Sequence, residues 1–447
     1  MGALGAFWNP EIERLTPEGL RRLESERLAR QIAYNYRSSV FFAAKLDEGR
    51  VRPERILSVE DLARVPFMEK REIAQSQEGG ALLGINQCAS LEDIVRIQAT
   101  GGTTGLPMRI GWTRRDIADY CEMGARALWT MGCRPRDIVF TCMNFSLYAG
   151  GVSDHMTFET LGATAIPYGV GQSERLLRMM TSLEDPVSIW ATPSYAVRLA
   201  EVAREIGLDP REVGISKGFF SGEAGLQVPG YREKIESIWG MVAQDMYGTG
   251  ELALHSGECS ERNGLHYGGT GFAVVELIDP DTGEVLPFEE GRQGEAVYTS
   301  IQREACPLQR MRSHDLMQVW TEPCACGRTS FRFKILGRSD DMFIVKGVNV
   351  FPLGIQATLL ALQPRITGEF QVWLDKPPPI DYAVPIKVEV AREVPEAARA
   401  ELAAEVARRL QREQNFTAAI ALVPQGTIAS ERKTRRVVRS YRGETGS

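Results

Sequence analysis

The most informative stretch of this chain is Ala99-Thr100-Gly101-Gly102-Thr103-Thr104-Gly105-Leu106-Pro107. It follows the apolar-leaning run Ile94-Val95-Arg96-Ile97 and combines three glycines with three threonines. Glycine lets backbone N–H groups approach a phosphate closely, and threonine hydroxyls add neutral donors. A loop of this composition after a strand indicates a polyphosphate-binding loop, with a Gly/Thr surface turn as the alternative. It is not the Gly-x4-Gly-Lys-Ser/Thr P-loop, because no Lys-Ser or Lys-Thr pair follows Gly105.

Length and composition narrow the class of protein. The chain has 447 residues, of which 43% are hydrophobic and 25% are charged, and this length predicts two or three domains. Its net charge of -6 provides no basic footprint and argues against nucleic acid as a partner. No apolar run is long enough to span a bilayer, and the N-terminus lacks a charged-then-apolar signal pattern. We therefore expect a cytoplasmic protein that has no membrane partner.

The larger part of the chain has the pattern of an α/β fold. A mainly helical segment, residues 10–78, precedes the Gly/Thr loop, and short strand-like runs then alternate with helical ones. The predicted strands are 138–142, 164–167, 188–191 and 218–221, and the predicted helices are 116–131, 173–182 and 194–206. This alternation predicts a largely parallel sheet. After Gly250 the helices fade, and the runs 274–278 and 294–299 predict a β-rich subdomain.

A second, smaller unit begins near Arg338. Strand-like runs occur at 343–345, 370–374, 386–390 and 418–423. Helices that open at Pro352 and Pro395 fit between them, since proline suits the first position of a helix. The resulting order, βαββαβ, is typical of a small α+β domain. We therefore expect a large multi-subdomain α/β N-terminal domain, residues 1–337, and a small mobile α+β C-terminal domain, residues 338–447.

Four further stretches occur in a characteristic order at long separations. They are DMYGTGE at 245–251, PLQRMRSHD at 307–315, GRSDDMF at 337–343 and GVNVFP at 347–352. Together with the Gly/Thr loop, they resemble the adenylate-forming enzymes and, within these, the phenylacetate–CoA ligase family. The likeness runs from residues 9–13 to Lys433, and the pair GRSDDM and GVNVFP is its most specific part.

The resemblance implies a ligase that works in two steps. A carboxylate attacks the α-phosphate of ATP to give an acyl-adenylate and diphosphate; the small domain then rotates, and the thiol of coenzyme A displaces AMP. The implied substrate is an aromatic acid of the arylacetate type, such as phenylacetate, indoleacetate or an amino-substituted relative. Two alternatives stay open: an enzyme that passes its acyl group to an amine or a carrier-protein thiol, and a nucleotide-binding homologue without turnover. The oligomeric state also stays open, with a homodimer among the options.

The same resemblance assigns the phosphate and metal contacts. The β- and γ-phosphates would be held by Thr100, Thr103, Thr104 and Gly105. Glu251 would bind Mg²⁺, a hard cation that prefers oxygen ligands. The chain departs from the family at Gly250, where the family has serine or threonine, so that a hydroxyl near the α-phosphate is missing.

Contacts to the nucleoside follow in the same way. Tyr247 would lie against the adenine. The loop that contains Glu223 resembles the family's loop on the other side of the adenine, with a plain turn as the alternative. Asp315 would accept the ribose hydroxyls, and Arg338 would contact them.

Two residues carry the implied domain movement and its chemistry. Asp340 matches the first residue of the hinge between the two conformations of the family. Lys433 matches the lysine that reaches the α-phosphate during adenylation. The family usually has glycine where Arg432 stands, and a solvated basic tail is the alternative interpretation.

The eight cysteines divide into two groups. Five are scattered in apolar or helical contexts and are expected in the core: Cys88, Cys121, Cys133, Cys142 and Cys306. The other three, Cys259, Cys324 and Cys326, could form a closed tetrahedral Zn²⁺ site with His266. His255 is the rival imidazole. Some members of the ligase group carry a structural zinc in the corresponding place, and an ion with four protein ligands would stabilise the β-subdomain rather than take part in chemistry.

The acyl pocket is expected around residues 145–155. Gly150 and Gly151 would leave room for an aromatic ring, against which Phe145 or Tyr148 could pack. Asp154 stands where phenylacetate ligases have a small residue. Because a buried aspartate is costly without a donor, we hypothesise that the substrate ring carries a donor such as an indole N–H or an amine; a helix-capping or solvent-facing Asp154 is the alternative.

Overall fold

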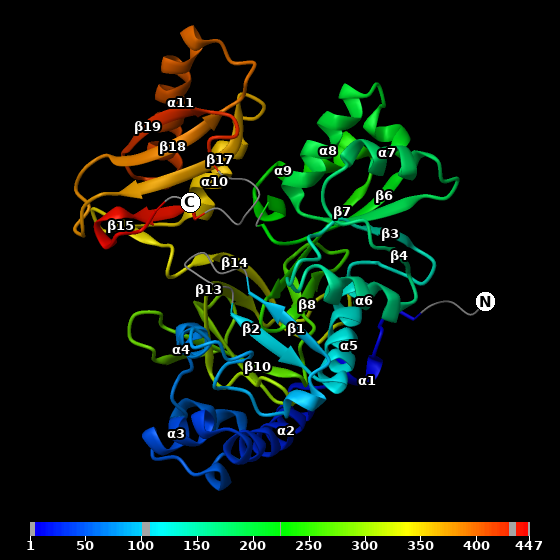
Figure 1. Ribbon diagram of the computed structural model, residues 1–447, viewed down its shortest axis with the longest axis vertical. Helices are drawn as coiled ribbons and strands as arrows, with labels where there is room; N and C mark the ends of the chain where they lie inside the picture. Colours follow the sequence, from blue (N-terminus) through cyan, green and yellow to red (C-terminus); the bar gives the residue numbers. More distant parts are fainter. Residues whose placement is uncertain (1–4, 101–107, 224, 429–434, 446–447) are drawn as a thin grey trace. The chain divides into compact units, whose positions relative to one another are not determined.

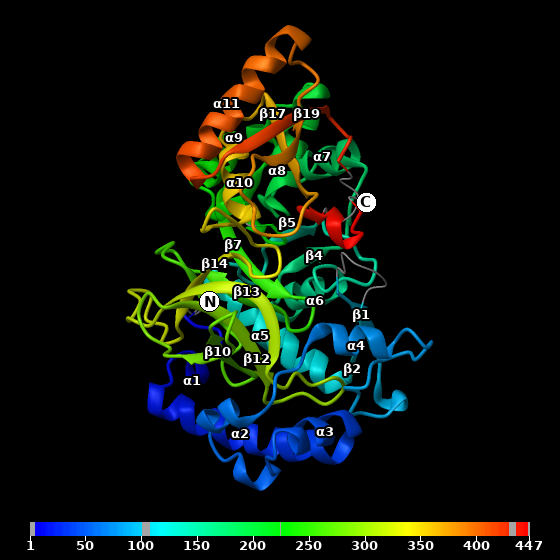
Figure 2. The ribbon, with the colours of Figure 1, turned by 90° about the vertical axis from the view of Figure 1, so that its left-hand side faces the viewer.

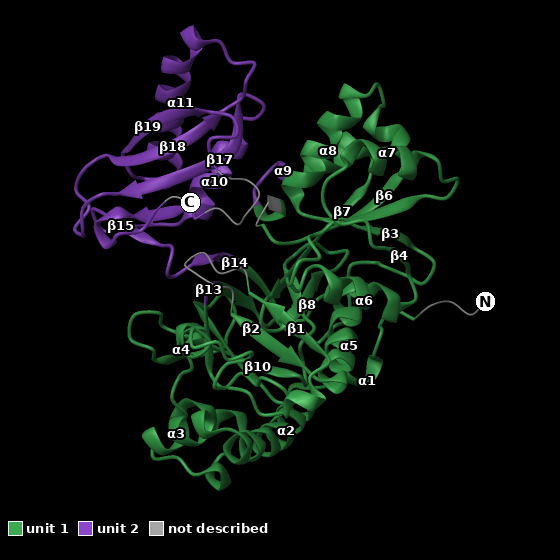
Figure 3. Cartoon of the chain, in the orientation of Figure 1, with its two compact units in different colours: residues 1–227, 232–313, 317–334 green, residues 228–231, 314–316, 335–447 purple. Residues whose placement is uncertain are grey.

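The computed structural model describes residues 5–100, 108–223, 225–428 and 435–445. These fall into two compact units, which Figure 3 distinguishes by colour. Unit 1 comprises residues 1–227, 232–313 and 317–334, and unit 2 comprises residues 228–231, 314–316 and 335–447. No helix within the described ranges is long and apolar enough to cross a membrane.

A sheet of 12 strands forms the centre of the large part of the chain, in the order β11-β10-β12-β13-β14-β9-β8-β7-β6-β5-β3-β4. Its parallel half contains β3 (Ile138–Thr141), β4 (Thr164–Ile166), β5 (Val187–Ala191), β6 (Ile215–Phe220) and β7 (Val242–Thr249). Every residue of β5 is buried, as expected for a parallel strand that is covered on both faces. The predicted α/β class is confirmed.

Helices connect the parallel strands, as right-handed crossovers require. They are α6 (Val152–Leu161), α7 (Ser173–Thr181), α8 (Pro193–Glu205) and α9 (Tyr231–Trp239). Figures 1 and 2 show α7 and α8 side by side next to strands of this half. Helix α8 begins where a sequence rule predicts, because Thr192 caps it by accepting a hydrogen bond from the Tyr195 N–H and Pro193 occupies its first position.

The other half of the sheet is the expected β-rich region. It consists of β8 (Ala253–Glu258), β9 (Leu265–Tyr267), β10 (Ala273–Ile278), β11 (Val285–Leu286), β12 (Gln293–Ser300), β13 (Met311–Trp320) and β14 (Arg332–Arg338). Strand β7 joins the two halves, since it runs parallel to β6 and antiparallel to β8. The turn between β7 and β8 therefore lies at the carboxyl edge of the parallel strands, where ligands of such sheets bind.

The N-terminal segment is mainly helical, as its sequence predicts. It contains α1 (Pro10–Glu13), α2 (Pro17–Ser38), α3 (Val40–Glu48) and α4 (Lys70–Ser76). A hairpin of β1 (Arg96–Ala99) and β2 (Arg109–Trp112) flanks the Gly/Thr loop and leads into α5 (Arg114–Thr130). Helix α5 packs on β8 and α6, around a buried core that includes Leu128, Phe158 and Trp190.

Unit 2 has its own core and its own sheet, in the order β19-β18-β17-β20. Its elements are β15 (Phe343–Val345), β16 (Val348–Val350), α10 (Pro352–Leu360), β17 (Ile366–Leu374), β18 (Val384–Val390), α11 (Glu396–Gln414), β19 (Ala418–Pro424) and β20 (Val437–Arg439). The α+β character is as expected. The first predicted strand differs, because 343–345 pairs with β16 in a separate hairpin, and β20 completes the four-stranded sheet.

Candidate nucleotide and acyl site, and a candidate metal centre

The carboxyl ends of β6 and β7 bring several predicted nucleotide contacts to one edge of the sheet. Tyr247 lies near the end of β7, where its half-buried ring stands edge-on to His255 at 5.2 Å and to Phe333 at 5.5 Å between ring centroids. Both supporting rings are fully buried, and burial lowers the pKa of His255 to about 3, so its imidazole is neutral. The orientation of the Tyr247 ring is thus fixed by packing before any nucleotide binds.

Glu251 lies in the turn between β7 and β8 and forms an ion pair that the sequence does not reveal. Its Oε1 atom is 2.6 Å from Nζ of Lys70, the first residue of α4; the side chains are 12% and 41% exposed, respectively. The segment before Lys70 is anchored through Met68, whose N–H donates to the Arg310 carbonyl and whose carbonyl accepts from the Arg312 N–H. A carboxylate presented in this way is a suitable oxygen ligand for Mg²⁺.

The missing hydroxyl at Gly250 has a structural explanation. A Cβ atom built on Gly250 would lie only 2.8 Å from Cγ2 of Thr100 and 3.2 Å from both its Cα and Cβ. Thr100 is 2% exposed, and no described residue is a hydrogen-bond partner of its hydroxyl. The hydroxyl of Thr249, one position away, accepts a hydrogen bond from the Leu252 N–H within the turn.

The carboxylate of Glu223 accepts hydrogen bonds from another part of the chain. Its Oε1 accepts a hydrogen bond from the Ser194 hydroxyl, and its Oε2 accepts from the Ser194 N–H at 3.3 Å. The side chain therefore binds the first turn of α8, next to the predicted adenine loop.

Asp315, Arg338 and Asp340 form one charged cluster in unit 2. The Arg338 guanidinium donates to both carboxylate oxygens of Asp340, at 2.9 and 2.8 Å, and to Asp315 Oδ1 at 3.2 Å. Burial raises the pKa of Asp340, but Arg338 outweighs this effect and keeps that pKa below its usual value. The Asp340 carbonyl also accepts from Arg439, so the predicted hinge residue is held on both its side chain and its main chain.

The predicted acyl residues occupy the connection between β3 and α6. Phe145 is half-buried and stands edge-on to His155 at 5.8 Å, while Tyr148 is 40% exposed. Gly151 permits a close approach, because a Cβ there would lie 2.5 Å from the Asn144 carbonyl oxygen. Gly150 lies close to Trp190, whose indole N–H donates to its carbonyl at 3.1 Å.

Asp154 is buried and has a donor of its own. The Tyr120 hydroxyl donates to Asp154 Oδ1 at 2.6 Å, and both side chains lie in the interior between α5 and α6. Burial raises the pKa of Asp154 to about 7, although the bonds from Tyr120 and from the backbone of Leu254 lower it. The burial of Asp154 therefore does not require a donor on the substrate.

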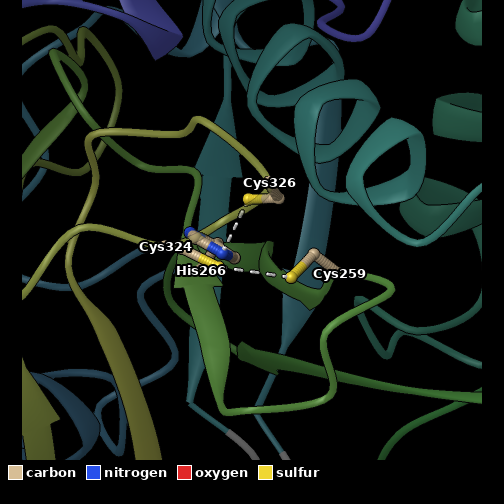
Figure 4. A group of neighbouring side chains, drawn as sticks. All are labelled: Cys259, His266, Cys324 and Cys326. Atoms are coloured by element: carbon tan, nitrogen blue, oxygen red, sulfur yellow. Dashed lines mark hydrogen bonds between the residues drawn. The ribbon is translucent and has the colours of Figure 1, made fainter.

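Four predicted ligands meet in a candidate metal centre, shown in Figure 4. The ligand atoms of Cys259, His266, Cys324 and Cys326 all lie within 4.8 Å of one another. The sulfur atoms of Cys259 and Cys324 are 3.7 Å apart, and Cys326 Sγ is 3.3 Å from Nε2 of His266. A tetrahedral ion with metal–sulfur bonds of about 2.3 Å separates two sulfurs by about 3.8 Å, so the geometry fits one ion.

The structure distinguishes between the two candidate imidazoles. The other ring nitrogen of His266, Nδ1, lies 3.3 Å from the Ser330 hydroxyl, an arrangement that orients a metal-binding histidine. His255 is instead enclosed by Tyr247, Tyr267 and Tyr298, and its Nδ1 atom lies 2.8 Å from the Ser256 hydroxyl. His266, not His255, therefore completes the cysteine cluster.

The remaining cysteines largely follow the prediction, since Cys121, Cys133, Cys142 and Cys306 are buried thiols and Cys88 is half-buried. Four predicted site residues, Thr103, Thr104, Gly105 and Lys433, lie outside the described residues. The roles of Lys70, Tyr120 and the buried Arg303 were not predicted. Nothing in their local sequence indicates that they contact residues so distant in the chain.

Comparison with known proteins identifies the class of enzyme. Residues 15–302 match the model of the AMP-binding enzyme family, and residues 347–440 match that of the AMP-binding enzyme C-terminal domain. The chain is 36% identical to the phenylacetate-coenzyme A ligase of Thermus thermophilus, over 86% of this chain and 84% of that protein. The Escherichia coli phenylacetate-coenzyme A ligase is 30% identical over 85% and 84%, respectively.

A solved structure gives the same result for the fold. The 2-hydroxyisobutyryl-CoA ligase in its postadenylation state aligns with a TM-score of 0.87 and 30% identity, covering 99% of this chain and 95% of that one. The fold and the two family models thus define an AMP-binding, adenylate-forming enzyme. More narrowly, the chain belongs to the phenylacetate-CoA ligase family and is an acid–thiol ligase.

Proposed function

We propose that this enzyme is an ATP-dependent aryl-CoA ligase. It adenylates an aromatic acid of the arylacetate type and transfers the acyl group to coenzyme A, giving aryl-CoA, AMP and diphosphate. The observation that carries the proposal is the β7–β8 turn, which presents Glu251 beside Lys70 and brings Gly250 against Thr100 at the carboxyl edge of the sheet. The likeness to proteins named phenylacetate-coenzyme A ligase supports the choice of acid.

In the first half-reaction the substrate carboxylate needs no general base, since it is ionised at neutral pH. The described residues instead position ATP and oppose its charge. Tyr247 offers its fixed ring to the adenine, and Thr100 offers a buried hydroxyl to a phosphate oxygen. Glu251 would hold Mg²⁺, which would supply positive charge to offset that of the polyphosphate.

Asp315 and Arg338 would bind the ribose, and Asp340 would act as the hinge. Arg338 pairs with both carboxylates of this cluster, so Asp315 can exchange its bond for ribose hydroxyls while Arg338 stays paired with Asp340. Lys433 would contribute a cation at the α-phosphate in adenylation alone.

The acyl group would lie against the β3–α6 connection, near Phe145, Tyr148, Gly150 and Gly151. Because Tyr120 already satisfies Asp154, we propose phenylacetate rather than a substrate with a ring donor as the reference acid. The likeness to 2-hydroxyisobutyryl-CoA ligase favours a second candidate, a short aliphatic hydroxy acid, since that protein aligns with almost the whole chain.

The candidate metal centre would hold a structural Zn²⁺. Three thiol sulfurs and one imidazole nitrogen are the ligand set that zinc prefers, and four protein ligands leave no open position for a substrate. The ion would link the end of β8, strand β9 and the connection before β14, and so stabilise the β-rich half of the sheet.

The proposal is tested by measuring thioester formation with phenylacetate, indoleacetate, an aminophenylacetate, benzoate and 2-hydroxyisobutyrate. We expect the highest kcat/KM for phenylacetate, with AMP and aryl-CoA formed in equal amounts. A preference for 2-hydroxyisobutyrate would establish the second candidate, and diphosphate release without thioester formation would point to another acyl acceptor. In the same assay Lys433→Ala should slow adenylation and spare thioester formation from supplied acyl-adenylate, because its cation acts only in the first step.

A further inference from the structure

A buried arginine lies directly behind the turn that carries Glu251. Arg303 follows β12 and is only 6% exposed. Its main chain is fixed by the Gln31 amide, which accepts from the Arg303 N–H and donates to the Arg303 carbonyl, both at 2.8 Å. Its guanidinium carbon lies 3.9 Å from the centre of the Trp112 ring. Both ends of this long side chain are therefore held in place.

The guanidinium is directed at the main chain of the metal-binding residue. Nη1 of Arg303 donates a hydrogen bond of 2.5 Å to the carbonyl oxygen of Glu251, while the carboxylate of Glu251 meets Lys70. Within the turn itself, the Leu252 N–H is held by the Thr249 hydroxyl. Arg303 thus connects this turn to the interior of unit 1 at the residue whose direction matters for binding a metal.

Burial lowers the pKa of Arg303 although the carboxylates of Asp116 and Glu251 favour its charged form, so stability alone does not explain a cation at this position. Nε and Nη2 of Arg303 have no hydrogen-bond partner among the described residues, and a buried, incompletely bonded charge costs free energy. An adjoining cavity, lined by Arg303, Trp112, Asp116, Asp119 and Gln302 among others, has room for about two water molecules. The nearby carboxylate of Asp116 is occupied by the N–H groups of Thr113, Glu304 and Ala305.

We propose that Arg303 is a positioning residue for the metal-binding carboxylate of Glu251. It fixes the main chain of the turn so that the carboxylate faces the polyphosphate. The inference rests on the proposed role of Glu251 as the Mg²⁺ ligand. Partners that orient a metal ligand commonly change metal affinity by about 10–100-fold when they are removed.

The test measures binding rather than turnover. Calorimetry of the full-length enzyme gives the Kd for ATP with and without Mg²⁺. The Kd without Mg²⁺ divided by the Kd with Mg²⁺ reports how strongly the metal is coupled to the nucleotide. Arg303→Met should reduce this ratio by about tenfold or more and leave the Kd without Mg²⁺ unchanged. The matched control is Arg126→Met, since Arg126 is 4% exposed, lies over the Phe272 ring and donates to the Thr270 carbonyl. It should lower stability without changing the ratio.

Two further variants separate the possible failures. If Glu251→Gln keeps the wild-type ratio, the proposed metal role of Glu251 is wrong; if Glu251→Gln loses it and Arg303→Met keeps it, only the present inference is overturned. Should Arg303→Met fail to fold, Arg303→Ala is measured with added guanidinium, at a concentration far below that which unfolds proteins. Return of the Mg²⁺ coupling with guanidinium supports the role, and a folded, rescued protein without that coupling overturns it.

Discussion

Replacing Gly250 by alanine places a methyl group in tight contact with Thr100 of the proposed phosphate site. The new Cβ would lie 2.8 Å from Cγ2 of Thr100 and 3.2 Å from its Cα and Cβ. Thr100 is 2% exposed, so its side chain cannot move into solvent to relieve the contact. Gly250 does not have the positive φ angle that would strain alanine, and the effect of the substitution therefore comes from packing.

The magnitude follows from two opposing terms. Overpacking a buried site by one methyl group costs about 1–3 kcal/mol, whereas replacing glycine in a compatible conformation stabilises by about 0.4–1 kcal/mol through the unfolded chain. The net expectation for Gly250→Ala is a loss of about 1–2 kcal/mol. Thr100→Ser removes Cγ2, the atom in the 2.8 Å contact, and keeps the contacts to Cα and Cβ at 3.2 Å, so Gly250→Ala should cost about 1 kcal/mol less in that variant than in the wild type.

The assay is a double-mutant cycle, with the free energy of unfolding measured in urea by tryptophan fluorescence. The expected coupling between the two substitutions is about 1 kcal/mol, within the range for residues in contact. Gly79→Ala is the control, because no atom lies within 4 Å of a Cβ built there; it should not lower stability. Additive effects of Gly250→Ala and Thr100→Ser would refute the argument that Thr100 occupies the space of a side chain at 250.

Three other substitutions test separate parts of the molecule. Cys326→Ser should lose about one bound zinc per chain by elemental analysis and lower the Tm, and a zinc-free wild-type enzyme of equal Tm would contradict the structural role. Tyr120→Phe removes a donor to Asp154, whose pKa of about 7 means that its carboxylate is charged near pH 8 and neutral near pH 5. Because this donor stabilises the charged form, the loss of unfolding free energy should be larger near pH 8 than near pH 5. A pH-independent loss would contradict this. Lys70→Met removes the ammonium that competes with a metal ion for the Glu251 carboxylate. Mn²⁺ binding without nucleotide, measured by electron paramagnetic resonance, should therefore become several-fold tighter. Unchanged or weaker binding would exclude this competition.

Features with a local cause could be predicted from the sequence. The run 188–191 is short, apolar and bounded by turn residues, and it lies within β5 (Val187–Ala191). The grouping of the four residues of the candidate metal centre could be predicted, because cysteine and histidine have distinctive chemistry. The choice of imidazole required the structure, since strand β8 encloses His255 among aromatic rings whereas β9 directs His266 to the cysteines.

Features set by distant contacts could not be predicted. Nothing in the residues around Arg303 indicates that its guanidinium reaches the Glu251 carbonyl, because the contact joins two loops that only the sheet brings together. The pairing of 343–345 was missed for a related reason: Gly347, with a φ of +83°, turns the chain back onto Val348–Val350 before the strand can join the larger sheet. A run of three residues does not specify its partner.

The hydroxyl of Thr100 provides the last prediction, and it concerns what replaces the group missing at Gly250. This hydroxyl is buried beside Gly250 and has no partner among the described residues, a state that costs about 1–3 kcal/mol. A phosphate oxygen of ATP would supply the acceptor. Thr100→Val should therefore preserve or raise the free energy of unfolding and at the same time weaken ATP binding by about tenfold, whereas Thr100→Ser should keep the affinity. A destabilised Thr100→Val that binds ATP normally would show that the hydroxyl is bonded within the protein and that the missing group is replaced elsewhere.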